Sequence, residues 1–236
     1  MTTTVTTDYQ YPTTYAPLTL ITACYRLKLH FPFHIRIESA MRAAMNIGRR
    51  PDAAESNFAI LHWQRLSSSY AEATSIILQK LREKILLDNQ CMEAISARKI
   101  RENDRTKQFM EEIWNEQGKN DIVFIGAQLG LRHAGRAIAE VKNNCDDNEF
   151  PLDLFSVACI LLQCPDRAKR SQNNLWIDCA GSELQSDTKR FNETPTFRFD
   201  LLCPRLFAEA TEDGPFARTG TATGFVPNYV VNPPQP

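Results

Sequence analysis

The stretch DIVFIGAQLGLRHAGRAIAEV, residues 121–141, decides the fold, because its residues permit two different structures. An apolar strand, a glycine turn and a helix would cradle a phosphate, as in nucleotide-binding folds. A dinucleotide fingerprint requires G-x-G-x-x-G, whereas Gly126, Gly130 and Gly135 stand four and five residues apart. No Lys followed by Ser or Thr comes after these glycines, so the P-loop pattern fails as well. The stretch therefore predicts no nucleotide cofactor.

In a helix, the apolar residues of the same stretch recur on one face: Phe124, Leu131, Ala134, Ile138 and Val141. Gly126 and Gly130 would let another backbone approach this helix closely. Each glycine costs about 1 kcal/mol in a helix interior, so the helix needs such a contact as compensation. We therefore expect a close-packed helix, with an extended start, in which Gly126 and Gly130 face a neighbouring backbone.

The segment from Asp52 to Gln117 contains neither Gly nor Pro, the two strongest breakers of helices, over 66 residues. Asp52 and Glu55 have the spacing of a capping box at a helix start. Apolar residues then recur in steps of three and four: Trp63, Leu66, Tyr70, Ala73, Ile77, Leu81 and Ile85. This pattern predicts the helical centre of the protein.

The apolar pattern fails between Ile100 and Phe109, which indicates a turn near Asn103 and therefore two or three helices. The segment TKQFMEEIWNEQG is typical of the last of these helices, with Thr106 as its cap and Gly118 at its end. Before this centre, residues 18–32 favour a β-strand. A short helix is expected to follow, opened by Glu38 or Ser39 and closed by Gly48 and Pro51.

The C-terminal half mixes both kinds of element. LFSVACILLQCP, residues 154–165, is a short buried element whose type the period does not settle. NLWIDCAGSEL and TPTFRFDLLCPRLF alternate as strands do. The termini are rich in Thr, Tyr and Pro and have no period that buries a face, so they are expected to be extended arms.

The predicted fold class is a predominantly helical α+β chain with a central helical bundle. The expected organisation is an N-terminal arm (1–17), a helical body (18–150), a mixed α/β C-terminal part packed on that body (151–224) and a C-terminal arm (225–236). The length of 236 residues allows one sizeable core with such appendages.

Composition places the chain among soluble globular proteins, with 43% hydrophobic and 23% charged residues. A formal net charge of −1 gives no overall attraction to nucleic acid or membrane, and no apolar run reaches the roughly 20 residues of a membrane helix. Seven cysteines form an odd set, and the N-terminus has no secretory pattern. We therefore expect reduced thiols in a cytoplasmic or virion protein.

Catalytic and metal sites have only weak candidates. The spacing of Cys159 and Cys164 does not suit zinc, and no histidine stands in a catalytic pattern beside a cysteine. His62 beside Trp63 favours a packing role. The acidic residues Asp146, Asp147 and Glu149 are typical of a solvated loop. No catalytic residue, metal ligand or cofactor is therefore predicted.

A nucleic-acid contact has one candidate. Arg98, Arg101 and Arg105 fall three and four residues apart, which places them on one face of a helix. Basic side chains on such a face can follow phosphates. Glu102 and Asp104 lie close enough to pair with them instead, as on a solvated face.

Three functional hypotheses follow. The leading one is a non-enzymatic structural or assembly subunit, such as a viral or phage coat or nucleoprotein component. Its terminal arms would hold it to copies of itself or to other subunits, with nucleic acid as a further partner and no membrane. The second is a nucleic-acid-binding regulator that uses Arg98, Arg101 and Arg105. The third is a cytosolic enzyme with a thiol site near Cys145–Cys164 or a nucleotide site at 126–135.

Overall fold

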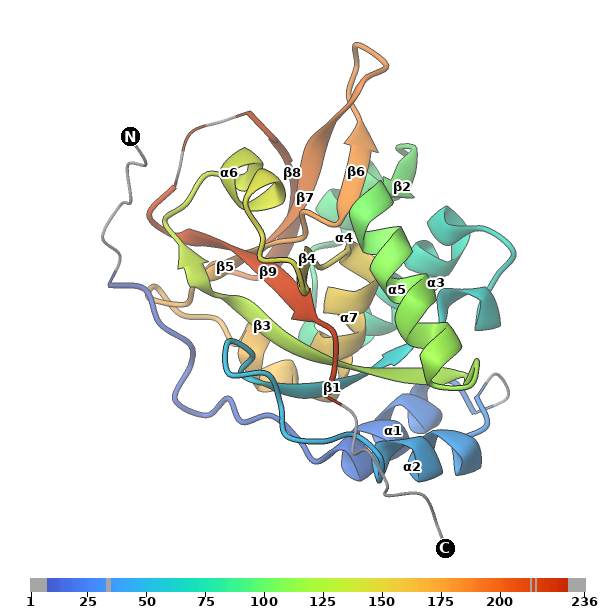
Figure 1. The fold of residues 1–236 in the computed structure, drawn as a ribbon. Coiled ribbons are helices and arrows are strands. Elements are labelled where there is room, and N and C mark those ends of the chain that lie inside the picture. Colours follow the sequence, from blue (N-terminus) through green and yellow to red (C-terminus); the bar gives the residue numbers. More distant parts are fainter. Residues whose placement is uncertain (1–7, 33–34, 213, 215, 229–236) are drawn as a thin grey trace, which may run out of the picture.

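The chain folds around one mixed β-sheet covered by helices, as the computed structural model shows for residues 8–32, 35–212, 214 and 216–228 (Figure 1). The expected fold class, a predominantly helical chain built on a bundle, is wrong. The described residues form a mixed α/β fold with a nine-stranded sheet, and this sheet takes strands from both sides of residue 150.

The strands are β1 (Ser56–Leu61), β2 (Ile100–Glu102), β3 (Ile122–Ala134), β4 (Glu149–Pro151), β5 (Trp176–Asp178), β6 (Ser182–Gln185), β7 (Phe191–Phe199), β8 (Pro204–Ala210) and β9 (Thr219–Phe225). Their order is β1-β3-β9-β5-β7-β6-β2, with β4 paired to β9 and β8 paired to β7. Among these described pairings, only that of β5 with β9 is parallel.

Strand β3 occupies most of the stretch for which a helix was predicted. Its first nine residues, 122–130, are all buried, with β1 bonded to one edge and β9 to the other. Because both faces are covered, the strand is a continuous apolar run without polar alternation, and a short run of this kind does not distinguish a strand from a buried helix. The predicted helix is therefore wrong up to Ala134, and helix α6 (Ile138–Asn143) begins only beyond it.

Gly130 marks the closest approach between β3 and β9. Its φ of 110° lies in the left-handed region, and a Cβ added there would lie 2.6 Å from the carbonyl oxygen of Gly220. At Gly126 an added Cβ would instead meet the Pro51 side chain at 2.8 Å. The two glycines thus lie in a strand rather than a helix, and the contact with a neighbouring backbone occurs at Gly130.

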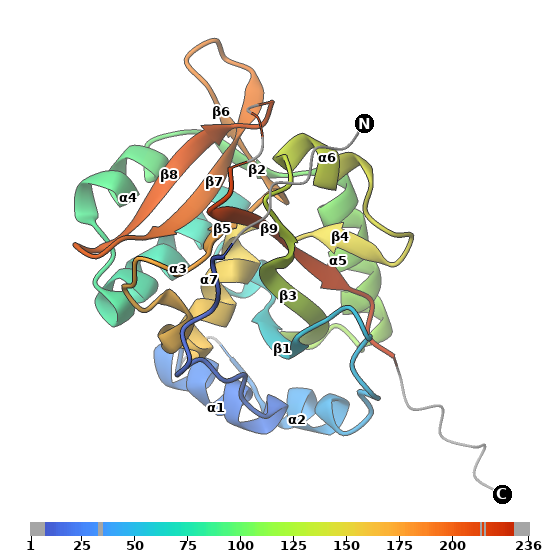
Figure 2. The same cartoon turned by 90° about the vertical axis from the view of Figure 1, so that its left-hand side faces the viewer.

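The remaining helices are α1 (Leu20–His30), α2 (Glu38–Ala44), α3 (Tyr70–Ile85), α4 (Asn89–Ser96), α5 (Asp104–Glu116) and α7 (Leu154–Gln163), with 3-10 turns η1 (Trp63–Arg65) and η2 (Pro165–Ala168). All ten residues of α7 are buried. This helix packs against β1, α1 and α3 and forms the centre of the core. Helix α5 packs against β3 and β4, and α1 and α2 lie together beside β1 (Figures 1 and 2).

The Gly- and Pro-free segment is helical only in part. It forms α3, α4 and α5, which agrees with two or three helices, and α5 ends just before Gly118 as expected. It also contains β1 and β2, which were not expected. Asp52 and Glu55 open no helix, and Glu55 accepts a hydrogen bond from the Leu129 amide instead. The cap of α5 is Asn103 rather than Thr106.

The flanking predictions had mixed outcomes. Residues 20–30 form α1 instead of the expected strand, with Thr19 as the helix cap. Helix α2 begins at Glu38 as predicted. The strands expected in NLWIDCAGSEL and TPTFRFDLLCPRLF are confirmed as β5 to β8.

The described parts of both terminal arms lie on their own chain (Figure 2). Gln10 forms a parallel bridge with Asn174, and the Tyr11 ring lies 4.2 Å from the guanidinium carbon of Arg167. At the other end, the Gly48 amide donates to the Asn228 carbonyl over 2.6 Å. Residues 1–7 and 229–236 of the predicted arms lie outside the described residues.

We expect Gly130→Ala to lower the free energy of unfolding by about 2–4 kcal/mol. Alanine is strained in the left-handed backbone conformation of Gly130, and its methyl group would also clash with the Gly220 carbonyl. Gly118→Ala is the matched control, since Gly118 also has a positive φ of 75° but nothing within 4 Å of the added carbon. It should cost about 1 kcal/mol. Urea unfolding measures both values, and equal losses would contradict the close contact between β3 and β9.

Candidate functional site

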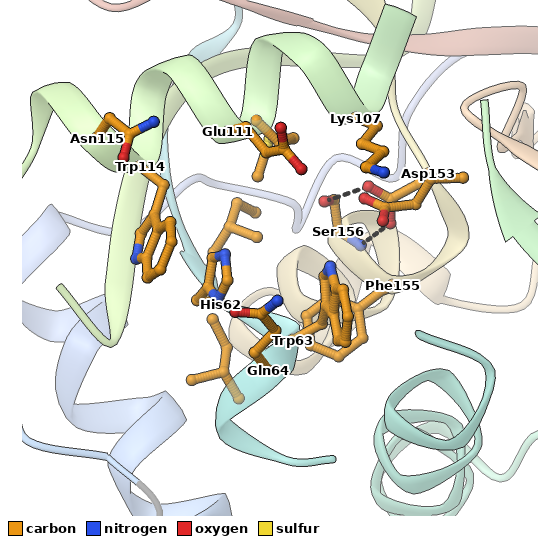
Figure 3. Close-up of a pocket in the computed structure, with 14 residues that line it drawn as sticks. His62, Trp63, Gln64, Lys107, Glu111, Trp114, Asn115, Asp153, Phe155 and Ser156 are labelled. Carbon is orange, nitrogen blue, oxygen red and sulfur yellow. Dashed lines mark hydrogen bonds between the residues drawn. The ribbon is translucent and has the colours of Figure 1, made fainter. Parts of the chain in front are cut away.

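A pocket of about 250 Å³ lies where α5, the N-terminus of α7 and the ends of β1 and β2 meet (Figure 3). We call it the α5–α7 pocket. Aromatic and apolar side chains make its wall, among them Trp63, Met110, Trp114 and Phe155. Carboxyl groups gather at one end of the pocket. It thus has the apolar lining with a few polar groups that is typical of small-ligand sites.

The aromatic wall is assembled from two segments that are distant in sequence. His62 follows β1 directly, and its ring stacks on that of Trp114 in α5 with the ring centres 4.0 Å apart and the planes at 15°. Trp63 opens η1 and meets the Tyr70 ring edge-on, with the centres 6.1 Å apart. The Trp114 indole is held by donating to the Asn120 carbonyl over 2.9 Å. The wall is therefore fixed before any ligand arrives.

His62 is the polar group within this wall. Its residue is only 8% exposed, and burial lowers the pKa of its imidazole to about 4, so the ring is neutral at physiological pH. Its Nδ1 is buried without a hydrogen-bond partner. Several buried side-chain atoms in the described residues lack a partner, but among them only this one belongs to a residue that lines the α5–α7 pocket. This nitrogen has almost no accessible surface, although its residue lines the pocket.

Asp153 forms the floor of the acidic end and caps α7. One carboxylate oxygen accepts from the Ser156 amide at 2.7 Å and from the Tyr70 hydroxyl at 3.2 Å, and the other accepts from the Ser156 hydroxyl at 2.9 Å. Burial raises the pKa of Asp153, and these donors oppose the increase. Because both oxygens accept hydrogen bonds at a helix N-terminus, the side chain is best stabilised as the carboxylate.

Glu102 stands beside this carboxylate at the end of β2. Burial raises the pKa of Glu102 to about 8, and the negative charge of Asp153 acts in the same direction. Lys107 and a hydrogen bond with Trp63 oppose the increase. Near neutral pH the pair therefore holds one proton, and it resides on Glu102, because Asp153 already accepts hydrogen bonds at both oxygens. The acidic end thus presents one carboxylic acid and one carboxylate.

The three arginines proposed for nucleic acid do not share a helix. Arg98 follows α4 and pairs with Glu193 at 2.7 Å, Arg101 lies in β2 and pairs with Glu183 at 2.8 Å, and Arg105 lies in α5. Arg105 donates to the carbonyl of Glu149 over 2.7 Å. The expectation of one helical face is therefore wrong, because β2 interrupts the helical pattern. Nucleic-acid binding by these residues stays a prediction.

The acidic segment 146–149 is only partly the solvated loop that was expected. Glu149 is buried and bonds to the His133 imidazole at 2.8 Å. Burial raises the pKa of Glu149, but the bonds from His133 and Thr223 outweigh it, and the net pKa lies below the usual value. Within the described residues, no three His, Cys, Asp or Glu side chains are placed to share a metal ion. All seven cysteines are unpaired thiols.

Comparison finds no protein-family model, no curated protein and no solved structure that matches this chain. In the part of the chain that the structure describes, no helix has the length and apolar character needed to cross a bilayer. The function must therefore be argued from the site itself.

We expect His62 to stay neutral from pH 8 down to about 5. Its pKa of about 4 in the folded chain lies below about 6.5 in the unfolded chain, so the unfolded state binds more protons between these values. The contribution of His62 to stability is then complete above pH 6.5 and declines as the pH falls toward 4. Ring carbon and nitrogen NMR shifts measure the titration directly. A midpoint near 6.5 in the folded protein would contradict the burial of this ring.

Proposed function

We propose that this chain is a small-molecule-binding protein whose ligand occupies the α5–α7 pocket. The observation that carries the proposal is the Nδ1 of His62, buried without a partner in the wall of a preformed cavity. A buried polar atom without a hydrogen bond costs about 1–3 kcal/mol. A ligand would gain the apolar contacts of the wall, and a small rotation of the His62 ring on binding would let it bond to this nitrogen and remove that cost.

The rigidity of the wall supports the proposal. Trp114 is held by its bond to Asn120 and by the His62 ring, and the acidic end is fixed by the cap of α7. A site that is already in place loses little conformational entropy when the ligand binds. The carboxylic acid of Glu102 beside the carboxylate of Asp153 also gives the pocket a proton donor and an acceptor. This is the kind of pairing that acid–base enzymes use, so a reaction at this site is a natural extension of binding.

Two of the three tryptophans line the pocket, so ligand binding should change the tryptophan fluorescence and raise the melting temperature. The screen should contain small cationic, neutral and anionic fragments with an aromatic or aliphatic body. Trp114→Ala removes part of the wall and should weaken binding by about tenfold.

The matched control is Trp176→Ala, because Trp176 packs against Arg198 and Arg218 and does not line the pocket. This variant should lose stability but keep its affinity at temperatures where it is folded. The proposal fails if no fragment of any charge class raises the melting temperature, or if both variants bind equally well.

A second candidate function is the assembly subunit that the sequence suggested. Residues 8–17 and 225–228 of the arms contact other parts of the same chain, so this candidate is argued from another surface. Helix α1 does favour it: Ile21, Tyr25 and Leu29 stand four residues apart and are 46%, 51% and 79% exposed. An apolar stripe of this kind is typical of a protein contact, and another copy of this chain is the expected partner.

If α1 is such a contact, the molar mass measured by light scattering should rise above 26.9 kDa with concentration. The double substitution Ile21→Lys and Leu29→Lys should restore the monomer, because charges on both residues cannot be buried in an apolar interface. Leu202→Lys is the control, since Leu202 is 75% exposed outside α1. A monomer at every concentration would remove this second candidate.

A further inference from the structure

We propose that the ligand of the α5–α7 pocket is an organic cation, an ammonium group on a small aromatic or aliphatic body, and that the ammonium binds at the Glu102–Asp153 end. This inference rests on the proposed function and assigns the ligand class. Three features support it: the charge of the lining, the aromatic rings within reach of its charged end, and the proton that Glu102 carries beside the Asp153 carboxylate.

The lining has an excess of negative charge. Its acidic side chains are Glu102, Glu111 and Asp153, and its one basic side chain among the described lining residues is Lys107. With Glu102 protonated, the lining still carries one net negative charge, and loss of that proton makes it two. An anionic ligand would meet this charge directly. A cation would neutralise it beside the buried Asp153, where electrostatic attraction is stronger than at an exposed carboxylate.

The pocket has a charged end, and aromatic rings lie both beside it and at the opposite end. Lys107, Asp153 and Ser156 gather at one end, and His62 and Trp114 stand at the other (Figure 3). An ammonium at the acidic end would therefore place its organic body against the aromatic rings. Aromatic faces attract cations and pack well against apolar groups, so both parts of such a ligand find a matching surface. The neutral imidazole of His62 adds a hydrogen-bonding site at the end of the body.

Binding of a cation must displace the proton of Glu102. The groups that face this carboxyl are Asp153 at the start of α7, Lys107 and Glu111 in α5, Trp63 in η1 and Tyr70 in α3. Among them only Lys107 favours ionisation through its charge. An ammonium beside Glu102 supplies a second positive charge and lowers the pKa of this group. The proton then leaves to solvent, and the complex contains two carboxylates and two cations at this end.

The direction of the pH dependence follows from this exchange. Below a pKa of about 8, Glu102 must lose its proton before the salt bridge forms, so affinity should rise by nearly tenfold per pH unit from pH 6 to 7. Above pH 8 the carboxyl is already ionised and the affinity should level off. A ligand without a positive charge gains nothing from the ionisation and should show no such rise.

The test compares three probes of matched shape by isothermal titration calorimetry: 2-phenylethylamine, 2-phenylethanol and phenylacetate. We expect the amine to bind at least about tenfold more tightly than the alcohol at pH 7.5, and phenylacetate not to bind. Titrations of the amine at pH 6.5 in phosphate and in a Tris-class buffer measure proton release. We expect about one proton per ligand bound.

Glu102→Gln is the decisive variant, because the amide has the shape of the protonated acid and leaves the fold undisturbed. It should abolish the proton release and weaken amine binding at pH 8 by tenfold or more, on the order of a charge-assisted hydrogen bond. Glu111→Gln is the matched control. It removes the same charge from an exposed position on α5, and it should keep the proton release and change affinity by about twofold or less.

Tighter or equal binding of the alcohol would overturn the cation assignment and leave the small-molecule site standing, whereas amine binding without proton release would overturn the placement of the ammonium beside Glu102. A cation that binds equally well to Glu102→Gln would overturn the placement of the ammonium at this end. If none of the three probes binds while other fragments raise the melting temperature, the ligand class is wrong and the proposed function survives.

Discussion

The complete burial of α7 is the constraint on which the core and the pocket both depend. A helix with no exposed residue cannot leave its first amides to water, so its cap has to be inside the protein. Asp153 fills that role, and its carboxylate is held by donors from Ser156 and Tyr70. The negative charge that the helix requires is therefore buried at the edge of a cavity. Burial of Glu102 raises its pKa, and that charge raises it further, so the packing of the core contributes to the chemistry of the pocket.

How much of the fold is visible in the sequence depends on how the elements are buried. Helices α3 and α5 have one exposed side, so their patterns of three and four residues identify them. Helix α7 and the first nine residues of β3 are buried on all sides. Helix α7 appears as an apolar run without a period, and the apolar residues around β3 also fit one face of a helix. The sequence left α7 undecided and assigned β3 to a helix. What separates the two is the tertiary contact: β3 finds partners at both edges in β1 and β9, which no local pattern records.

The candidate site was largely hidden for a related reason. His62 and Trp63 were noticed as neighbours within a helical pattern, but they follow strand β1, and Trp114, whose ring stacks on His62, is distant in the chain. Glu102 was assigned to local pairing with the arginines around it. A detectable signal existed for Asp153, which precedes an apolar run and has Ser156 three residues later, the spacing of a helix cap. Nothing in the sequence indicated that this cap would face Glu102, because the contact joins the end of a strand to the start of a helix.

Buried charge alone does not make a site, and a second cluster of this chain shows the difference. Arg167 is fully buried, but its guanidinium donates to Asn174, Leu129 and Leu175, and Tyr11 covers it from the N-terminal arm. Glu55 in turn accepts from Tyr11, Tyr15 and the Leu129 amide. The chain itself supplies partners for both terminal nitrogens of Arg167 and for the Glu55 carboxylate, and it leaves only the Arg167 Nε of this cluster unbonded, so the cluster fastens the arm to the core. At the α5–α7 pocket the chain leaves His62 Nδ1 without a partner and an excess of negative charge in the lining. Such an imbalance beside open space is better explained by a ligand than by packing.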